Sequence, residues 1–292
     1  MRQPTKAIIL AAGFGTRFLP ATKSIPKEMF PVVDKPVIQY IVEQAVESGV
    51  KDIIIVTSSN KHAIEDYFDR DDNLERLLRE SGKEAIADDL QRISELANFS
   101  YIRQKGTPKG TARPILNCAH LIDDDEPFFV FFADDFYVTE GKPWPAQLLE
   151  AYNKTGKTVI SMMEIDKKDA DKYAIAEFGE KVNDRLFQIN ELIEKPRAQK
   201  AKSNFASISG FLLTPDILPI LDKVPVSKSG EIFLADGLNQ LAKKDKIFGC
   251  FVDGVRYDTG DKLLYIQAVV DVALNNPKYH DDLVKFLRER IS

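Results

Sequence analysis

Three short, continuously apolar segments dominate the first half of the chain and restrict the folds that it can adopt. They occupy residues 5–11 (TKAIILA), 52–57 (DIIIVT) and 127–133 (PFFVFFA). Each has the length of a β-strand and lacks the polar alternation of a half-exposed strand, as is typical of strands that are buried on both faces. The segments therefore predict a parallel sheet.

Helical patterns separate these strands. In residues 36–48, apolar side chains recur on one helical stripe, and Gly49 follows at the position of a C-terminal cap. The order strand, helix, strand makes a βαβ unit. It recurs with a strand at residues 99–103 and a helix at 111–121, whereas the charge-rich, helical residues 69–97 are predicted to lie outside the sheet.

The second half of the chain has a more mixed texture. Strands are predicted at residues 158–164, 173–178, 186–193 and 205–214, with few helices between them. Helices at 231–243 and 262–275 flank a last strand at 246–252, and a short charged helix at 281–291 is predicted as an oligomer contact. Because no Pro/Gly-rich linker divides the halves, we predict one doubly wound, Rossmann-like α/β domain with a mostly parallel mixed sheet and an appended smaller sheet region.

Composition and charge exclude several classes of function. The 292-residue chain has a net charge of −5 and a pI near 5.4, so no general attraction to nucleic acid or to an anionic membrane is expected. No apolar run approaches the length of a membrane span, and the first strand begins too close to Met1 for a signal peptide. Cys118 and Cys250 lack the paired spacing of a disulfide scaffold or a zinc site. A cytoplasmic protein is predicted.

A glycine loop follows the first strand directly. Gly13 and Gly15 in AAGFGTR let the backbone approach a ligand closely and turn its N–H groups toward phosphate oxygens. The dinucleotide-binding fingerprint requires a third glycine at position 18, where Phe18 stands, and no Walker pattern is present. The loop therefore predicts a phosphate site of another kind.

Three cations lie on the long connection after this loop. Arg17, Lys23 and Lys27 could neutralise a triphosphate and stabilise the transition state at its α-phosphorus. The alternative is a glycine turn followed by solvated cations. The position of the loop at the carboxyl end of the first strand, where open α/β sheets bind ligands, favours the functional interpretation.

Two aspartate motifs are candidates for a metal site. Asp134 and Asp135 end the strand at 127–133, on the same rim as the glycine loop, where a carboxylate could bind Mg²⁺ or simply stabilise a turn. Asp258 begins Asp-Thr-Gly, which is also the signature of aspartic proteases, but such enzymes need two facing copies and the chain has one. The other interpretation of Asp258 is a cap for the helix that follows.

Residues 11–36 (AAGFGTRFLPATKSIPKEMFPVVDKP) closely resemble the signature of the bacterial UTP–glucose-1-phosphate uridylyltransferases, also called UDP-glucose pyrophosphorylases. The T-K-x-I-P-K-E-M part is specific to that branch of the sugar-nucleotide pyrophosphorylases, and the resemblance continues more weakly to about residue 275. It implies a fold of the sugar nucleotidyltransferase type in a single domain, 1–292, with a nucleotide-binding half (1–140), a sugar-binding half (141–262) and C-terminal helices (263–292). It also implies Mg²⁺ as cofactor, and UTP and glucose 1-phosphate as substrates.

The resemblance assigns roles to individual residues. Arg17 and Lys27 match catalytic positions, and Asp134 and Asp258 match the metal ligands. The positions that match nucleotide contacts are Ala11, Ala12, Gly13, Gly15 and Thr16 in the loop, and Gln104 and Gly110 at the base. The positions that match sugar and sugar-phosphate contacts are Asp135, Ala174, Glu194, Lys195 and Gly210.

The chain departs from the family pattern at three places. Residues 110–114 read GTARP where the family has G-L-G-H-A, Ala174 stands for a glycine, and residues 230–236 read GEIFLAD against D-E-I-Q-L-T-D. These differences surround the base and the sugar, so an alternative is a nucleotidyltransferase of the same fold with another nucleotide or sugar, such as a thymidylyltransferase. A non-catalytic sugar-nucleotide sensor is disfavoured by the presence of the catalytic and metal positions. A homodimer or homotetramer is expected.

Overall fold

The apolar segments of the first half form the centre of a nine-stranded sheet in the computed structural model, which describes residues 1–244 and 246–291. Its strands in chain order are β1 (Lys6–Leu10), β4 (Asp52–Thr57), β5 (Asn98–Arg103), β6 (Phe128–Phe132), β8 (Thr158–Glu164), β9 (Ala174–Asn183), β10 (Leu186–Glu194), β11 (Phe205–Leu213) and β12 (Ile247–Phe251). Two short antiparallel pairs stand apart from it: β2 (Pro31–Val32) with β3 (Lys35–Pro36), and β7 (Asp135–Val138) with β13 (Val255–Asp258).

The sheet changes character along its width. Its strand order is β5-β4-β1-β6-β11-β8-β12-β10-β9. The first four strands are mutually parallel, as the βαβ pattern predicts. From β11 onward most neighbours are antiparallel, with β12 and β8 as a further parallel pair. The strands of the second half thus continue the same sheet. The region that the sequence predicts as a smaller appended sheet joins the main sheet where β11 pairs with β6.

Successive residues of each central strand enter two different cores. On β4, Ile53 and Ile55 belong to one apolar cluster, whereas Ile54 and Val56 belong to the other. The same alternation holds on β1 and β6. Because side chains alternate across a strand, a run without polar residues must be covered on both faces. The burial pattern of these runs is therefore the physical reason for the doubly wound arrangement.

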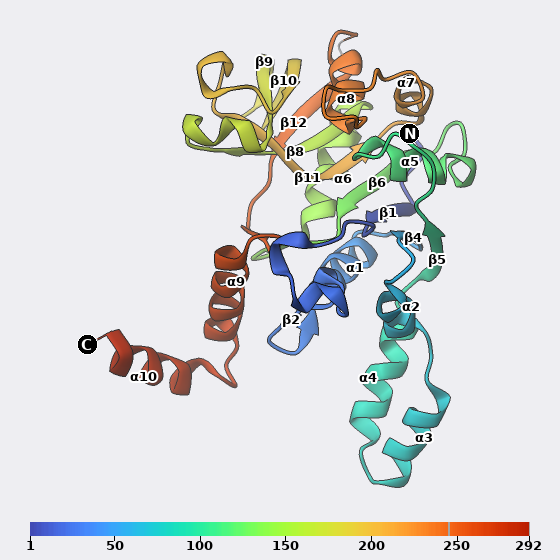
Figure 1. Ribbon diagram of the computed structural model, residues 1–292, viewed down its shortest axis with the longest axis vertical. Coiled ribbons are helices and arrows are strands. Elements are labelled where there is room, and N and C mark those ends of the chain that lie inside the picture. Colours follow the sequence, from blue (N-terminus) through green and yellow to red (C-terminus); the bar gives the residue numbers. More distant parts are fainter. Residues whose placement is uncertain (245, 292) are drawn as a thin grey trace.

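Helices cover both faces of the sheet (Figure 1). The α-helices are α1 (Val37–Glu47), α2 (His62–Phe68), α3 (Asp72–Glu80), α4 (Glu84–Ser94), α5 (Ala112–Cys118), α6 (Trp144–Thr155), α7 (Leu218–Leu221), α8 (Leu234–Ala242), α9 (Lys262–Asn275) and α10 (His280–Ile291). Helices α1, α2 and α6 contribute to one core, and α5, α7 and α8 contribute to the other. Among the described helices, none is long and apolar enough to cross a membrane.

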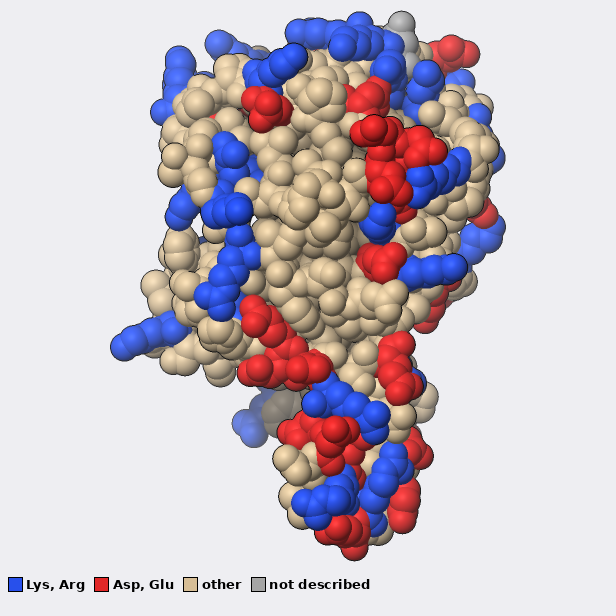
Figure 2. Space-filling view, turned by 90° about the vertical axis from the view of Figure 1, so that its right-hand side faces the viewer, with Lys and Arg blue, Asp and Glu red and all other residues tan. Residues whose placement is uncertain are grey.

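Helices α3 and α4 form an arm that extends away from the sheet, and α9 and α10 project at another side of the molecule (Figure 1). The arm corresponds to the charge-rich excursion predicted at residues 69–97. Its surface carries interleaved acidic and basic side chains (Figure 2). The prediction that this segment lies outside the sheet is confirmed.

Several elements differ from the sequence prediction. Helices α2 and α6 and the β7–β13 pair were not predicted, and α8 begins at Leu234 rather than at residue 231. The later start has a physical reason: Ile232 donates its backbone N–H to the carbonyl of Lys109 at 2.8 Å, so this stretch pairs with a loop instead of continuing the helix. Trp144, expected to be a packing anchor, is fully buried against Phe131 and Tyr137.

Candidate active site

Two adjoining cavities open at the carboxyl ends of the parallel strands. The larger one, which we call the glycine-loop cavity, has a volume of about 600 Å³ and extends from the end of β1 to the ends of β4 and β5. Four of the predicted nucleotide contacts line it: Ala12, Gly13, Gln104 and Gly110. The parallel strands thus bring segments that are about a hundred residues apart in the sequence to one rim.

Three other predicted nucleotide contacts shape the loop without lining this cavity. Ala11 is fully buried and donates its N–H to the carbonyl of Val56 at 2.9 Å. Gly15 has a φ of +62°, and a Cβ added there would lie 3.0 Å from Thr22 Cγ2. Thr16 begins the 3₁₀ turn that carries Arg17. Their position supports a role in holding the loop's backbone.

Gly110 is a glycine for reasons of backbone approach. Its φ is +115°, and a Cβ added there would lie 2.3 Å from the carbonyl oxygen of Ile232. A larger residue would both strain the backbone and push this pairing apart. The family pattern and the structure therefore agree on glycine here, although the residues that follow it differ from the family.

The smaller cavity, which we call the Glu194 cavity, has a volume of about 230 Å³ and lies on the side of the antiparallel strands. The predicted site residues that line it are Arg17, Asp134, Asp135, Ala174, Glu194, Lys195 and Asp258. Thr111, Phe132, Asp134 and Lys195 line both cavities. Asp134 and Lys195 thus lie at the junction of the two cavities.

The two cavities together form a cleft, and Lys27 contacts Asp134 across it. The Lys27 ammonium forms a short ion pair with Asp134 Oδ2, and both side chains are largely buried. Burial by itself would lower the pKa of Lys27, but the nearby Asp134 and Glu28 carboxylates outweigh it and raise that pKa. Lys27 is therefore a fixed cation at the junction of the cavities.

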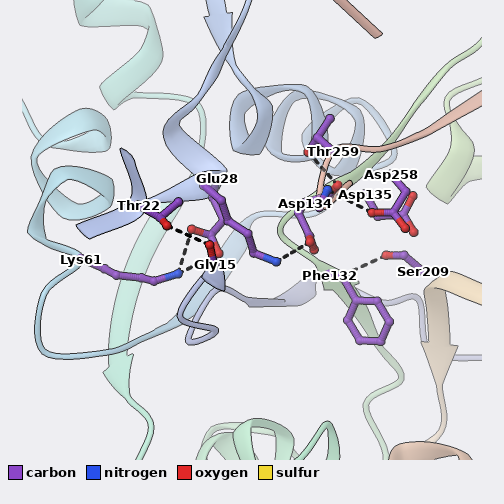
Figure 3. A network of polar contacts seen from close by, with 12 residues as sticks. Gly15, Thr22, Glu28, Lys61, Phe132, Asp134, Asp135, Ser209, Asp258 and Thr259 are labelled. Atoms are coloured by element: carbon purple, nitrogen blue, oxygen red, sulfur yellow. Dashed lines mark hydrogen bonds and ion pairs between the residues drawn. The ribbon is translucent and has the colours of Figure 1, made fainter. Parts of the chain in front are cut away.

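Asp258 and Arg17 converge on the same point as Asp134. A Cβ added at Gly260 would lie 2.5 Å from Asp134 Oδ2, 2.9 Å from Arg17 Nη2 and 3.0 Å from Asp258 Oδ1. The two segments are joined by Thr259, whose backbone N–H and hydroxyl both donate to the carbonyl of Asp134 at 2.8 Å. Figure 3 shows Asp134 between Glu28 on one side and Asp258 on the other.

The carboxylate oxygens of Asp134 and Asp258 are ligands that suit a hard divalent cation. Asp134 and Asp258 supply carboxylate oxygens on either side of Gly260, and Mg²⁺ is commonly bound by one or two carboxylates together with substrate phosphates. Within the described part of the chain, no group of three or more His, Cys, Asp or Glu side chains is placed to hold a metal. Further ligands of such an ion would come from a bound phosphate or from water.

Asp135 is held by a residue that the sequence did not single out. Arg256, on the neighbouring strand β13, donates from Nε at 2.8 Å and from Nη2 at 2.6 Å to the Asp135 carboxylate. Burial raises the pKa of Asp135 to about 6, against the opposing effect of Arg256. The only sequence signal for Arg256 is its place two residues before Asp258. Asp135 is opposite Asp258 in the β7–β13 pair, so Arg256 reaches it diagonally, and both side chains line the Glu194 cavity.

Glu194 is the last residue of strand β10 and lines the Glu194 cavity, and Lys195 follows it at the junction of the two cavities. Lys195 has a positive φ of 43°, its N–H donates to the carbonyl of Tyr173 at 3.0 Å, and its ammonium lies 3.6 Å from Glu194 Oε1. Burial raises the pKa of Glu194, although Lys195 opposes the shift. A non-glycine residue in this strained conformation is typical of functional sites.

Gly210 lies beside a buried aromatic side chain rather than in a cavity wall. Its φ is +100°, and a Cβ added there would lie 2.1 Å from Trp144 Cζ2. It does not line the Glu194 cavity, although Ser209 and Phe211 on either side of it do. The glycine at this position is therefore explained by the packing of Trp144.

Comparison with known proteins connects this geometry to a family. A family model described as nucleotidyl transferase matches residues 6–274. The chain is 44% identical over 289 residues to UTP–glucose-1-phosphate uridylyltransferase 2 of Staphylococcus saprophyticus, covering 99% of each chain. It is similar to a UDP-glucose pyrophosphorylase solved in complex with UDP-glucose (37% identity, TM-score 0.84, 94% and 100% of the two chains). A UTP-bound UGPase of Acinetobacter baumannii gives 31% identity and a TM-score of 0.89 over 99% of both chains.

Proposed function

Because the chain belongs to the nucleotidyl transferase family, we propose that it transfers a uridylyl group from UTP to glucose 1-phosphate, with release of pyrophosphate and formation of UDP-glucose. The proposal is supported by relatives that carry this activity in their names and by a solved relative that holds UDP-glucose. These similarities extend over almost the whole chain.

One observation carries the proposal within the structure. Lys27 and Arg17, from the N-terminal connection, meet Asp134 and Asp258 where the two cavities join. A triphosphate in the glycine-loop cavity and a sugar phosphate in the Glu194 cavity would therefore meet at a point with two cations and two metal-binding carboxylates. This is the charge distribution that attack on an α-phosphate requires.

The reaction that we propose needs no nucleophilic side chain. An anionic oxygen of glucose 1-phosphate attacks the α-phosphorus of UTP, a new P–O bond forms, and the bond between the α-phosphorus and the bridging oxygen to the β-phosphate breaks. The electron pair leaves with pyrophosphate. Lys27 and Arg17 offset the negative charge that gathers on the α-phosphate oxygens, and the backbone at Gly13 holds the nucleotide's phosphates in place.

Asp134 and Asp258 are the residues that would hold Mg²⁺. The ion, when bound, supplies a positive charge that neutralises phosphate oxygens and fixes their orientation. The ion pair between Lys27 and Asp134 keeps the aspartate in place on the nucleotide side. The Thr259 hydrogen bonds to the Asp134 carbonyl hold the two aspartate segments together.

The remaining roles follow the two cavities. We assign Gln104 and Gly110 to the base, because both line the glycine-loop cavity from the connection between β5 and α5. Glu194 accepts hydrogen bonds from the sugar hydroxyls, and Lys195 binds the 1-phosphate at the cavity junction. Asp135 and the backbone of Ala174 complete the sugar side.

Three further expectations belong to this proposal. Residues 1–140 form the nucleotide-binding half, 141–262 the sugar-binding half and 263–292 the C-terminal helices of one domain. The protein assembles as a homodimer or homotetramer, which is supported by exposed Phe286 and Ile291 on the projecting helix α10. It acts in the cytoplasm, and it has no nucleic-acid or membrane partner.

A pyrophosphate-release assay tests the function directly. UTP, dTTP, ATP and GTP are each combined with glucose 1-phosphate, galactose 1-phosphate and N-acetylglucosamine 1-phosphate, with Mg²⁺ or with a chelator. We expect the highest kcat/KM for UTP with glucose 1-phosphate and no release in the chelator. Higher kcat/KM for dTTP would instead favour a thymidylyltransferase, and absence of release with every pair would contradict the proposal.

A further inference from the structure

A buried ion pair lies directly behind the proposed catalytic lysine. Lys61 Nζ lies 2.8 Å from both Oε1 and Oε2 of Glu28, and the two side chains are only 5% and 1% exposed. Glu28 follows Lys27 in the sequence, in the 3₁₀ turn Lys27–Met29. Figure 3 shows Lys61 extending toward Glu28 from the side that faces away from Asp134.

The two members of this pair have different access to the cleft. Glu28 lines the glycine-loop cavity beside Lys27 and Gln104. Lys61 is not among the residues that line it, and it belongs to the connection between β4 and α2, where it is the N-cap residue of α2. Lys61 thus connects the cavity wall to the parallel part of the sheet without facing the ligand space.

Burying this ion pair costs desolvation free energy, so stabilisation of the fold is a poor explanation for its presence. Burial raises the pKa of Glu28 and lowers that of Lys61, and the charge of each partner opposes the shift of the other. Two charges taken out of water usually stabilise a fold no better than apolar side chains of the same volume. Removing one partner, however, leaves an uncompensated buried charge.

The segment that carries Lys27 lies outside the sheet and is attached to the body by apolar contacts and ion pairs. The ring centroids of Phe18 and Phe30 lie 5.9 and 5.8 Å from that of Tyr265 on α9. Residues 13–30 contain only short 3₁₀ turns and pair with no strand of the nine-stranded sheet. The Thr22 hydroxyl bonds back to the carbonyl of Gly15 within the same segment.

At residues 27 and 28, two ion pairs tie the segment to the body: Lys27 pairs with Asp134 after β6, and Glu28 pairs with Lys61 after β4. A bound substrate would interact with Lys27 and Asp134 and so change their ion pair. The Glu28–Lys61 pair would stay in place.

We propose that Lys61 is a positioning residue of the active site: it holds Glu28, and through Glu28 the Lys27 turn, in place on the nucleotide side of the cleft. This inference rests on the proposed function. Because neither Lys61 nor Glu28 lines the Glu194 cavity, the loss of Lys61 should raise KM for UTP and leave KM for glucose 1-phosphate unaffected.

The test compares Lys61→Met with Lys6→Met as a control. Lys61 follows the carboxyl end of strand β4, whereas Lys6 lies at the amino end of the neighbouring strand β1. Lys6 Nζ lies 2.5 Å from Oε2 of Glu126, so Lys6→Met also breaks an ion pair between a lysine and a buried glutamate. The Lys6 side chain itself is 20% exposed, and Thr5 also donates to Glu126. Initial rates are measured with each substrate varied in turn, well below the melting temperature of every variant. UTP binding is measured separately by calorimetry.

We expect Lys61→Met to lower kcat/KM for UTP at least tenfold and to leave KM for glucose 1-phosphate within twofold. Lys6→Met should lower the melting temperature and leave both kinetic parameters within twofold. A folded Lys61→Met variant with less than a threefold loss of kcat/KM for UTP, or one whose KM for glucose 1-phosphate rises as much as its KM for UTP, overturns the inference. If that variant does not fold, the double variant Lys61→Met/Glu28→Gln, which loses the ion pair but buries no unpaired charge, is judged by the same thresholds. A wild-type protein without activity would contradict the proposed function instead, and calorimetry with UTP would still test Lys61.

Discussion

The cleft and the α3–α4 arm both pair many charges, but in different surroundings. On the arm, Arg76 and Glu80 lie 2.9 Å apart with side chains that are 61% and 58% exposed. Arg79 pairs with Asp88 in the same way. In the cleft, the Lys27–Asp134 pair is largely buried, and the Lys61–Glu28 pair is almost completely so.

The difference shows that the surroundings of an ion pair decide what it does. Exposed pairs are solvated and screened, so each contributes about 0–1 kcal/mol to stability. Buried pairs lose their hydration and depend on each other, so the removal of one partner costs about 3–5 kcal/mol. Charged residues of the arm can therefore be substituted with little effect on stability. Those of the cleft are fixed in position and can interact with a ligand.

The strongest test of this comparison is the substitution Lys27→Ala. It leaves Asp134 without its cation and removes positive charge from the α-phosphate, so kcat should fall by about two to three orders of magnitude. Pyrophosphate release at saturating substrates measures the effect, and circular dichroism checks the fold. A kcat within tenfold of the wild type would remove Lys27 from the mechanism.

The next largest effect is expected from Asp258→Asn. The amide keeps the shape of the side chain but binds Mg²⁺ more weakly, so the Mg²⁺ concentration for half-maximal activity should rise by about tenfold or more. Asp261→Asn is the matched control, because Asp261 only caps α9 by accepting from the N–H of Leu263 at 2.9 Å. An equal Mg²⁺ shift in both variants would argue against a metal role for Asp258.

A smaller effect is expected from pH at Glu194. Burial raises its pKa, so as pH falls from neutrality it takes up a proton before an ordinary glutamate does. The protonated carboxyl accepts fewer hydrogen bonds from the sugar, so kcat/KM for glucose 1-phosphate should decline on the acid side. In Glu194→Gln this decline should be reduced at a lower overall kcat/KM, with the titration of the substrate's own phosphate common to both proteins. Superimposable acid limbs would assign the decline to the substrate alone.

The smallest effect is expected on the arm. Arg79→Ala removes an exposed partner of Asp88, so the free energy of unfolding should change by no more than about 0.5 kcal/mol. The kinetic parameters should stay at wild-type values. Urea denaturation and the same rate assay measure both, and an effect on rate similar to that of Lys27→Ala would break the comparison between the arm and the cleft.

Much of the fold was predictable because local patterns and tertiary packing agree in the parallel half. Residues 52–57 form β4 with the predicted bounds, and residues 262–275 form α9 in the same way. The prediction was weakest where a helix had no clear stripe to mark it. Helix α6 begins with Trp144 and Pro145, and its burial depends on contacts with residues of β6 and β8 that only the folded chain brings together.

The candidate site was predictable to the extent that its residues belong to contiguous motifs. Motif positions at the glycine loop, at Asp134 and at Asp258 line two adjoining cavities, as expected for one rim of a sheet. Arg256 and Lys61 carried no motif of their own, because an ion-pair partner is recognisable only when the two side chains are near each other. Gly210 shows the converse, since a matching motif position faces Trp144 instead of a cavity.

The parallel strands, the glycine loop and the aspartates at the carboxyl ends of the strands follow from the sequence alone, because apolar runs and glycine turns act over a few residues. The folded chain was needed to show which charges are buried, which carboxylate each cation contacts, and that the antiparallel strands extend the same sheet. Burial and pairing depend on distances between residues far apart in the chain, and those distances exist only after the sheet has formed.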